Sequence, residues 1–186
     1  MLGACRQPDP SANPGVSLGL AIGTLARDGR DKLTFLVDDE LASFGGWLEQ
    51  LIAESTGRHG VGIVPVDLEP LGAAATYGSD RAFVRISLVD GTAGGRDALA
   101  TALGEAGHPV IRIAVNDPID LGAEFVRWEV ATAIAGAILG IDPFDQPNVE
   151  EAKELTRTVL ARHEAGQHES DAGPAPLLAG DPSEVL

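Results

Sequence analysis

Apolar and polar positions along the chain follow two different periods. Short apolar runs with β-branched members predict strands, and they occupy residues 33–37, 61–66, 83–89 and 110–115. Between and around these runs, apolar residues recur every three or four positions, which predicts amphipathic helices. These helices cover residues 14–27, 40–56, a segment from about 96 to 107, 121–139 and 148–163. In the first of them, Leu18, Leu20, Ile22 and Leu25 are expected on the buried side.

Strands that alternate with helices form βαβ units, which indicate an α/β fold with a mainly parallel sheet. The sequence predicts about four to five strands, with helices on both faces, in a three-layer αβα arrangement. Ligands of such folds bind beyond the carboxyl ends of the strands. This rule favours the segments that follow Val37, Val66, Val89 and Val115.

Composition divides the chain into three parts. Residues 1–12 include Pro8, Pro10 and Ser11 and predict a flexible leader, and residues 13–163 carry the folded domain. Residues 164–186 combine glycine, alanine, proline and acids, which predicts a disordered acidic tail. The single cysteine, Cys5, provides no disulfide framework, so a cytoplasmic location is expected.

The formal net charge of −15 restricts the possible partners. Nucleic acids and anionic membranes require a basic surface, so neither is an expected partner. An anionic substrate would need a local group of donors that works against the overall field. The four histidines show no metal-ligand spacing with cysteine or carboxylates, and no organic cofactor motif is present.

Glu54 is the first candidate for chemistry. It is expected near the C-terminal end of a helix, where the negative end of the helix dipole disfavours a carboxylate and suits a general base. An exposed surface glutamate is the alternative interpretation. The neighbouring Ser55, Thr56 and Arg58 are candidate donors for an anion, with Arg58 supplying the charge.

Two further segments join this list. Residues 142–153 form a polar turn with two prolines followed by a helix start, and they present Gln146 and Lys153. Lys153 is a candidate ligand clamp or acid, or else an ordinary solvated helix lysine. The glycine-rich residues 90–96 fit neither common phosphate-binding pattern, so a plain turn from strand to helix is favoured.

Two of these segments carry a resemblance to a known family. Residues 142–153 (DPFDQPNVEEAK) resemble the C-terminal signature of glucose-6-phosphate isomerases, and residues 54–58 (ESTGR) resemble the segment that holds their catalytic glutamate. The similarity extends from about residue 13 to 162. It is strongest to the isomerase part of bifunctional transaldolase/glucose-6-phosphate isomerase proteins, and it implies a sugar-phosphate-binding domain of the SIS type.

The resemblance implies an aldose–ketose isomerase of glycolysis and gluconeogenesis. Glu54 would move a proton between C1 and C2 of the sugar phosphate through a cis-enediol, with no metal or cofactor. Lys153 would assist ring opening, and Gln146 would contact the substrate. The family builds its site from two SIS halves, and only the second is matched here. A homodimer or a complementary N-terminal half is therefore expected, with a non-catalytic sugar-phosphate-binding module or an inactive fragment as alternatives.

Overall fold

A computed structural model describes residues 1–57, 60–145 and 147–164 of the chain. The chain divides into two compact units, Met1–Asp145 and Gln146–Leu186, and each is described by itself. Arg58, His59, Gln146 and the expected tail from residue 165 lie outside the described residues. In the second unit, the described part is the helix α5, Pro147–Glu164.

The first unit is built on a parallel sheet of four strands in the order β2-β1-β3-β4. The strands are β1 (Lys32–Val37), β2 (Val64–Val66), β3 (Arg81–Leu88) and β4 (Val110–Val115). All three neighbouring pairs run parallel, and β1 and β3 are paired along the whole of β1. The expected α/β class and parallel sheet are therefore confirmed, and the first unit has four strands among its described residues.

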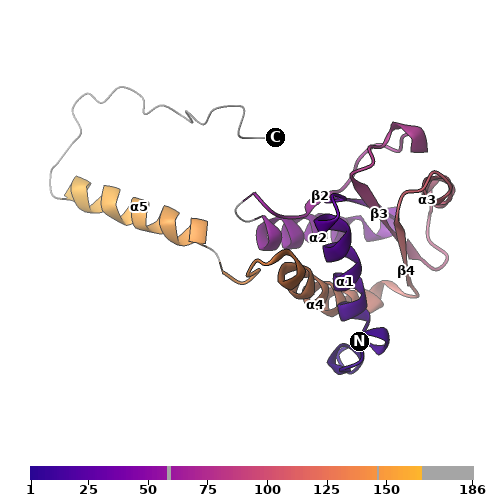
Figure 1. Cartoon of the computed structure of the whole chain (residues 1–186), viewed down its shortest axis with the longest axis horizontal. Coiled ribbons are helices and arrows are strands. Elements are labelled where there is room, and N and C mark those ends of the chain that lie inside the picture. Colours follow the sequence, from indigo (N-terminus) through magenta and orange to yellow (C-terminus); the bar gives the residue numbers. More distant parts are fainter. Residues whose placement is uncertain (58–59, 146, 165–186) are drawn as a thin grey trace. The chain divides into compact units, whose positions relative to one another are not determined.

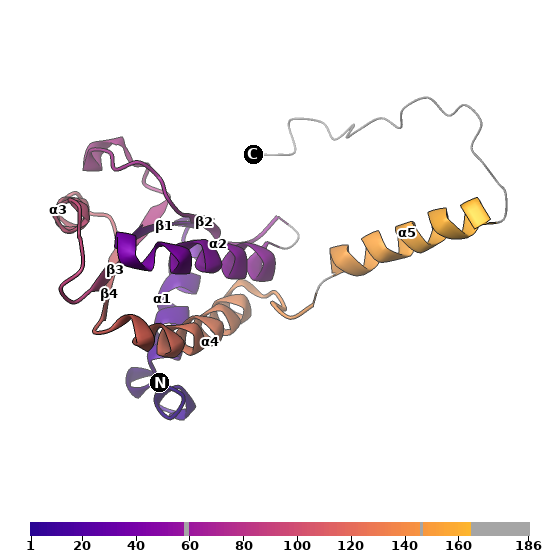
Figure 2. The same cartoon turned by 180° about the vertical axis from the view of Figure 1, so that it is seen from behind.

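Helices cover both faces of the sheet (Figures 1 and 2). One face packs against α1 (Pro14–Arg27), α2 (Ala42–Thr56) and α4 (Leu121–Leu139), and the other against α3 (Arg96–Glu105). Alternate residues of β1 supply the two cores: Phe35 and Val37 face the three-helix layer, and Leu36 faces α3. The predicted three-layer arrangement is confirmed.

The start of β2 and the buried side of α1 differ from the sequence-based expectations. The second strand begins at Val64 rather than at residue 61, because the chain before it folds back over the end of α2. Leu20 is 41 % exposed, although it was expected in the core. The buried stripe of α1 instead consists largely of small residues, and its members are Gly15, Leu18, Gly19, Ile22, Gly23 and Ala26.

The glycines of this stripe allow α1 and α4 to approach closely. A Cβ atom on Gly19 would lie 2.5 Å from the Ala131 carbonyl oxygen, and one on Gly15 would lie 2.7 Å from Val130 Cβ. Gly23 meets the backbone of Ala135 in the same way, at 2.9 Å from its Cα. The spacing of four residues places the glycines on one side of the helix. Backbone-to-backbone contact therefore replaces interdigitated side chains along this interface.

The residues before α1 contain two short 3₁₀ turns, Ala4–Arg6 and Pro10–Ala12. Asn13 is buried, and its side-chain amide donates to the carbonyl oxygens of Cys5 at 2.9 Å and Gln7 at 3.0 Å. Its Oδ1 accepts from the Val16 amide and caps α1. The Asn13 side chain thus caps α1 and also binds the preceding residues.

A buried arginine joins the layers at the carboxyl edge of the sheet. Arg85 on β3 is 2 % exposed, and its guanidinium lies 2.6 Å from Asp38 Oδ1 and 2.7 Å from Asp97 Oδ1. It also donates to the carbonyl oxygens of Leu36 and Ile86. The second oxygen of Asp38 accepts from the Leu88 amide at 2.9 Å. One side chain therefore links β1, β3 and α3.

Among the described residues, no helix combines the length and apolar character that a membrane crossing requires.

The glycine stripe predicts a sharp difference between two glycine-to-alanine changes. Gly19→Ala should lower the free energy of unfolding by about 1–3 kcal/mol, because its methyl group would collide with α4. Gly46→Ala on α2 is the matched control, since nothing lies within 4 Å of its Cβ position. That change should stabilise the protein by about 0.5–1 kcal/mol. Urea unfolding measures both values, and an equal response would contradict the tight interface.

The buried ion pair predicts a second contrast, between two adjacent aspartates. Asp38→Asn should destabilise the fold by about 3–5 kcal/mol, because the Arg85 charge would remain buried with weaker compensation. Asp39→Asn removes a carboxylate that is 67 % exposed and paired with Arg96, and it should cost at most about 1 kcal/mol. Chemical denaturation of both variants tests this, and a mild effect of Asp38→Asn would refute the structural importance assigned to the pair.

Candidate functional site

Glu54 lies in the last turn of α2 and is exposed to solvent. The helix follows β1 and leads to β2, and Val64, the first residue of β2, pairs with Lys32, the first residue of β1. The helix must therefore return from the carboxyl edge of the sheet to the amino edge. Glu54 is thus placed at the amino edge, opposite the edge where ligands of open α/β sheets usually bind.

The immediate surroundings of Glu54 are polar. The Gln50 side-chain amide donates to Glu54 Oε1 at 3.3 Å, one helical turn earlier. The carboxylate also lies at the C-terminal end of α2, where the helix dipole is negative. An accessible carboxylate in this position is able to accept a proton from a bound molecule. The structure thus confirms the predicted place of Glu54 at the end of the helix.

Thr56 is fully buried beneath this end of the helix. Its hydroxyl donates to the Ile52 carbonyl oxygen at 2.8 Å and accepts from the Ile63 amide at 2.9 Å. These bonds join α2 to the segment that enters β2. A Cβ atom on Gly62 would lie 2.9 Å from the Thr56 carbonyl oxygen, so this segment passes close to the helix. Substrate contact by Thr56 stays a prediction. For such a contact, the Thr56 hydroxyl would have to give up its hydrogen bond with the Ile63 amide.

The other predicted residues are distributed over both units. Ser55 is half-buried next to Glu54, and Arg58 lies outside the described residues. Lys153 is exposed on α5, which belongs to the second unit, and Gln146 lies outside the described residues. The structure therefore brings Glu54, Ser55 and Thr56 together at one helix end. The role predicted for Lys153 stays a prediction.

The glycine-rich segment after β3 forms a turn that is bound to the start of the α2 region. Both the amide and the hydroxyl of Thr92 donate to the Glu40 carboxylate, the hydroxyl at 2.7 Å. The Thr92 hydroxyl lowers the pKa of Glu40. Gly94 and Gly95 adopt positive φ angles of 52° and 88°, which favour glycine. The donors of this segment serve the neighbouring loop, which supports the interpretation as a plain turn.

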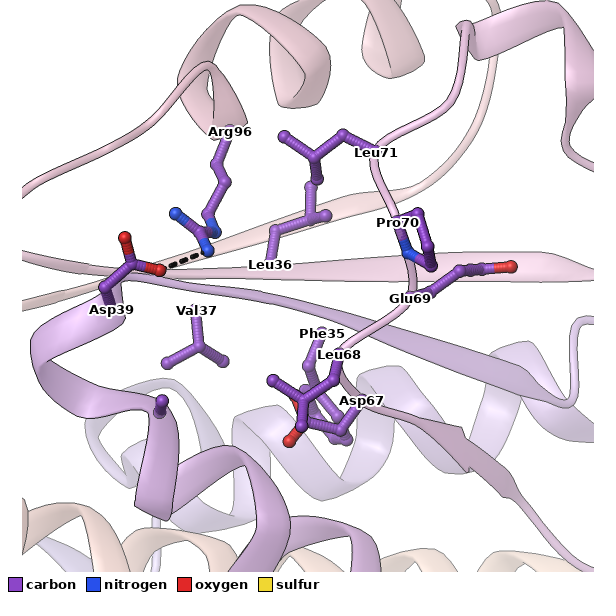
Figure 3. Close-up of a pocket in the computed structure, with 11 residues that line it drawn as sticks. Phe35, Leu36, Val37, Asp39, Asp67, Leu68, Glu69, Pro70, Leu71 and Arg96 are labelled. Atoms are coloured by element: carbon purple, nitrogen blue, oxygen red, sulfur yellow. Dashed lines mark hydrogen bonds and ion pairs between the residues drawn. The ribbon is translucent and has the colours of Figure 1, made fainter.

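A cleft of about 260 Å³ opens at the carboxyl edge of β1 and β2 (Figure 3). Val37 and Leu36 form its floor, Asp39 and Arg96 stand on one side, and the chain after β2 forms the other side. The alternation of strands and helices in the sequence predicted a ligand site at this edge of the sheet. The residues that line the cleft carried no recognisable motif, because they come from separate loops.

Asp67 contributes a carboxylate to this cleft, and none of the ion pairs among the described residues includes it. Its Oδ2 is buried and makes no hydrogen bond with the described residues. Both carboxylate oxygens occupy the space left by the missing side chain of Gly45, where a Cβ would lie 2.5 Å from Oδ1. Burial raises the pKa of Asp67, and the charge of Glu49 adds to this effect. Gly45 therefore allows Asp67 to pack closely against α2.

Comparison with known proteins finds relatives that are named glucose-6-phosphate isomerase. No protein-family model matches the chain. The chain is 28 % identical to the glucose-6-phosphate isomerase of Symbiobacterium thermophilum over an alignment of 195 positions. This alignment covers 86 % of this chain and 44 % of the relative. It is 41 % identical to that of Rubrobacter xylanophilus over 68 residues, which cover 36 % of this chain and 16 % of the relative. The chain therefore spans less than half the length of these curated relatives.

A solved structure supports the fold. A hypothetical protein from Thermus thermophilus superposes with a TM-score of 0.68 at 22 % identity, over 86 % of this chain and 48 % of that chain. This likeness confirms the α/β architecture. The sequence comparisons add that the chain is similar to proteins named glucose-6-phosphate isomerase.

The bonds of the Thr56 hydroxyl predict different results for two substitutions. Thr56→Val should destabilise the protein by about 1–3 kcal/mol, because the buried Ile63 amide would lose its acceptor. Thr56→Ser keeps the hydroxyl and should retain most of that stability. Urea unfolding compares the two variants, and hydrogen exchange at the Ile63 amide reports the bond directly. Unchanged protection of this amide in Thr56→Val would contradict the assignment.

Proposed function

We propose that this chain is the second SIS-type half of a glucose-6-phosphate isomerase. The reaction would interconvert glucose 6-phosphate and fructose 6-phosphate in glycolysis and gluconeogenesis. The observation that carries the proposal is the similarity to an isomerase over 86 % of this chain but only 44 % of the relative. A match of that extent is what one half of a two-half enzyme would give.

Glu54 is proposed as the base that carries the proton between C1 and C2. It removes the proton from C2 of the open-chain aldose, so that a cis-enediol forms as the carbonyl oxygen gains a proton. Return of the proton to C1, together with loss of the proton from the C2 hydroxyl, completes the ketose. Exposure of Glu54 at the end of α2 supports this role, because a substrate must reach the carboxylate directly. No electron leaves the sugar, so the reaction requires no redox cofactor.

Lys153 and Gln146 are proposed to act from the second unit. Lys153 would stand beside the ring oxygen and support ring opening, and Gln146 would contact the sugar phosphate. Ser55 and Arg58, next to Glu54 in the sequence, are proposed as further donors to the substrate. Exposure of Lys153 on α5 is compatible with contact to a ligand.

The partner proposed for this chain is a complementary half or a second subunit. A sugar phosphate carries negative charge, and this chain carries a net charge of −15, so the phosphate needs additional donors. In the family that the chain resembles, the first half supplies these donors. A cytoplasmic location and a relationship to the isomerase part of transaldolase fusion proteins belong to the same proposal.

The proposal predicts weak or absent turnover by the chain alone and turnover once the complementary half is added. Conversion of fructose 6-phosphate is measured by coupling to an NADP-linked glucose-6-phosphate dehydrogenase. In the reconstituted enzyme, Glu54→Gln should lower kcat by about 10²–10⁴-fold, because a general base is lost. Glu49→Gln, on an earlier turn of α2, is the control and should change kcat little.

Three outcomes separate the alternatives. Strong turnover by the chain alone that Glu54→Gln abolishes would contradict the need for a second half. Absence of turnover in both preparations, together with a higher Tm in 6-phosphogluconate, would favour a non-catalytic binding module. Absence of both effects would favour an inactive fragment.

A further inference from the structure

The carboxyl-edge cleft lies apart from the residues proposed for isomerisation. Glu54 stands at the amino edge of the sheet, whereas the cleft is formed where β1 and β2 end. Parallel sheets commonly bind ligands at this carboxyl edge. The cleft is therefore available for a second molecule, whatever the function of Glu54.

The charged groups around the cleft leave one carboxylate uncompensated. Arg96 lies 2.6 Å from Asp39, which neutralises that side of the cleft. Glu69 turns away from the cleft and binds Arg81 through two contacts of 2.6 and 3.1 Å (Figure 3). None of the ion pairs found among the described residues includes Asp67. The local charge thus favours a cation with a single positive group.

The remaining surface of the cleft is apolar. The floor and walls contain Leu36, Val37, Ala42, Leu68, Pro70 and Leu71. Leu68 is 79 % exposed and has a positive φ of 55°, a conformation that non-glycine residues rarely adopt. An apolar residue held in this strained, exposed position can gain contacts if an aliphatic group enters beside it. The volume of about 260 Å³ suits a small molecule or one long side chain.

A metal ion does not fit this lining. The described residues contain no group of three or more histidine, cysteine, aspartate or glutamate side chains that could hold one. Divalent cations require several oxygen ligands at once, whereas an ammonium group needs few acceptors and tolerates an apolar neighbourhood along its stem.

From these observations we infer that the cleft binds an alkylammonium group, with the ammonium at Asp67 and its aliphatic stem along Leu36, Val37 and Leu68. The net charge of −15 raises the local concentration of such cations. The group belongs either to a free small amine or to a lysine side chain of another protein. Both sources present the same chemistry to the cleft.

Titrations followed by ¹⁵N–¹H NMR test this site in the full chain. The probes are n-pentylammonium for a free amine and Nα-acetyl-lysine methylamide for a lysine side chain, with 1-pentanol as the neutral analogue. Saturable shifts are expected at the amides of Ala42, Leu68 and Leu71, with a Kd of about 1 mM or tighter. The probe that binds more tightly identifies the source of the amine.

Substitutions then assign the binding to the cleft. Asp67→Asn keeps the shape of the side chain and should weaken binding at least about tenfold, the loss of one favourable charge contact. Ala42→Phe should block the cleft without a change of charge. Glu129→Gln removes the same charge from an exposed position on α4 and should alter Kd less than about twofold. Circular dichroism verifies that each variant is folded.

The inference is overturned if 1-pentanol binds as tightly as n-pentylammonium, or if Asp67→Asn and Glu129→Gln have equal effects. Shifts that do not saturate at about 20 mM probe would overturn it too. Each result is independent of isomerase activity, so failure here leaves the proposed function intact.

Discussion

The buried Arg85 is the interaction on which the carboxyl edge of the sheet depends. Its charge has been removed from water, so the surrounding strands must supply acceptors for it. Asp38 can do so only if β1 ends beside β3 in the observed register, and Asp97 only if α3 begins at the adjacent turn. The carbonyl oxygens of Leu36 and Ile86 complete this shell. A shift of any one element would remove at least one acceptor from this buried charge, so the contacts of Arg85 favour one arrangement of three elements.

This constraint also positions the two sides of the cleft. Asp39 and Ala42 follow Asp38 in the chain, and Arg96 precedes Asp97 at the start of α3. The opposite wall is fixed differently, by the contact of Asp67 with the bare Cα of Gly45 and by the pair between Glu69 and Arg81. Rigid polar contacts thus frame an opening that apolar side chains alone would tend to close.

Much of the fold could be predicted because periodicity reports burial directly. The bounds of α1, α4 and β4 follow from apolar runs, an asparagine cap and terminal glycines. Leu20 was wrongly expected on the buried side of α1. The side of α1 that contacts α4 is lined by glycines, which give no hydrophobic signal in the sequence. The cleft could be assigned to an edge of the sheet but not to residues, since Asp67 and Arg96 come to line the same cleft only after folding. Glu54 was recognisable from a local motif, whereas the burial of the Thr56 hydroxyl depends on Ile63 across a turn.

The close contact of α1 with α4 has a consequence for synthesis of the protein on the ribosome. The glycine-lined side of α1 emerges early, but its partner helix is translated only after the whole sheet. Until then, α1 has a weak apolar face and several helix-destabilising glycines, so it gains little from forming alone. Completion of the fold must therefore wait for the last helix of the first unit.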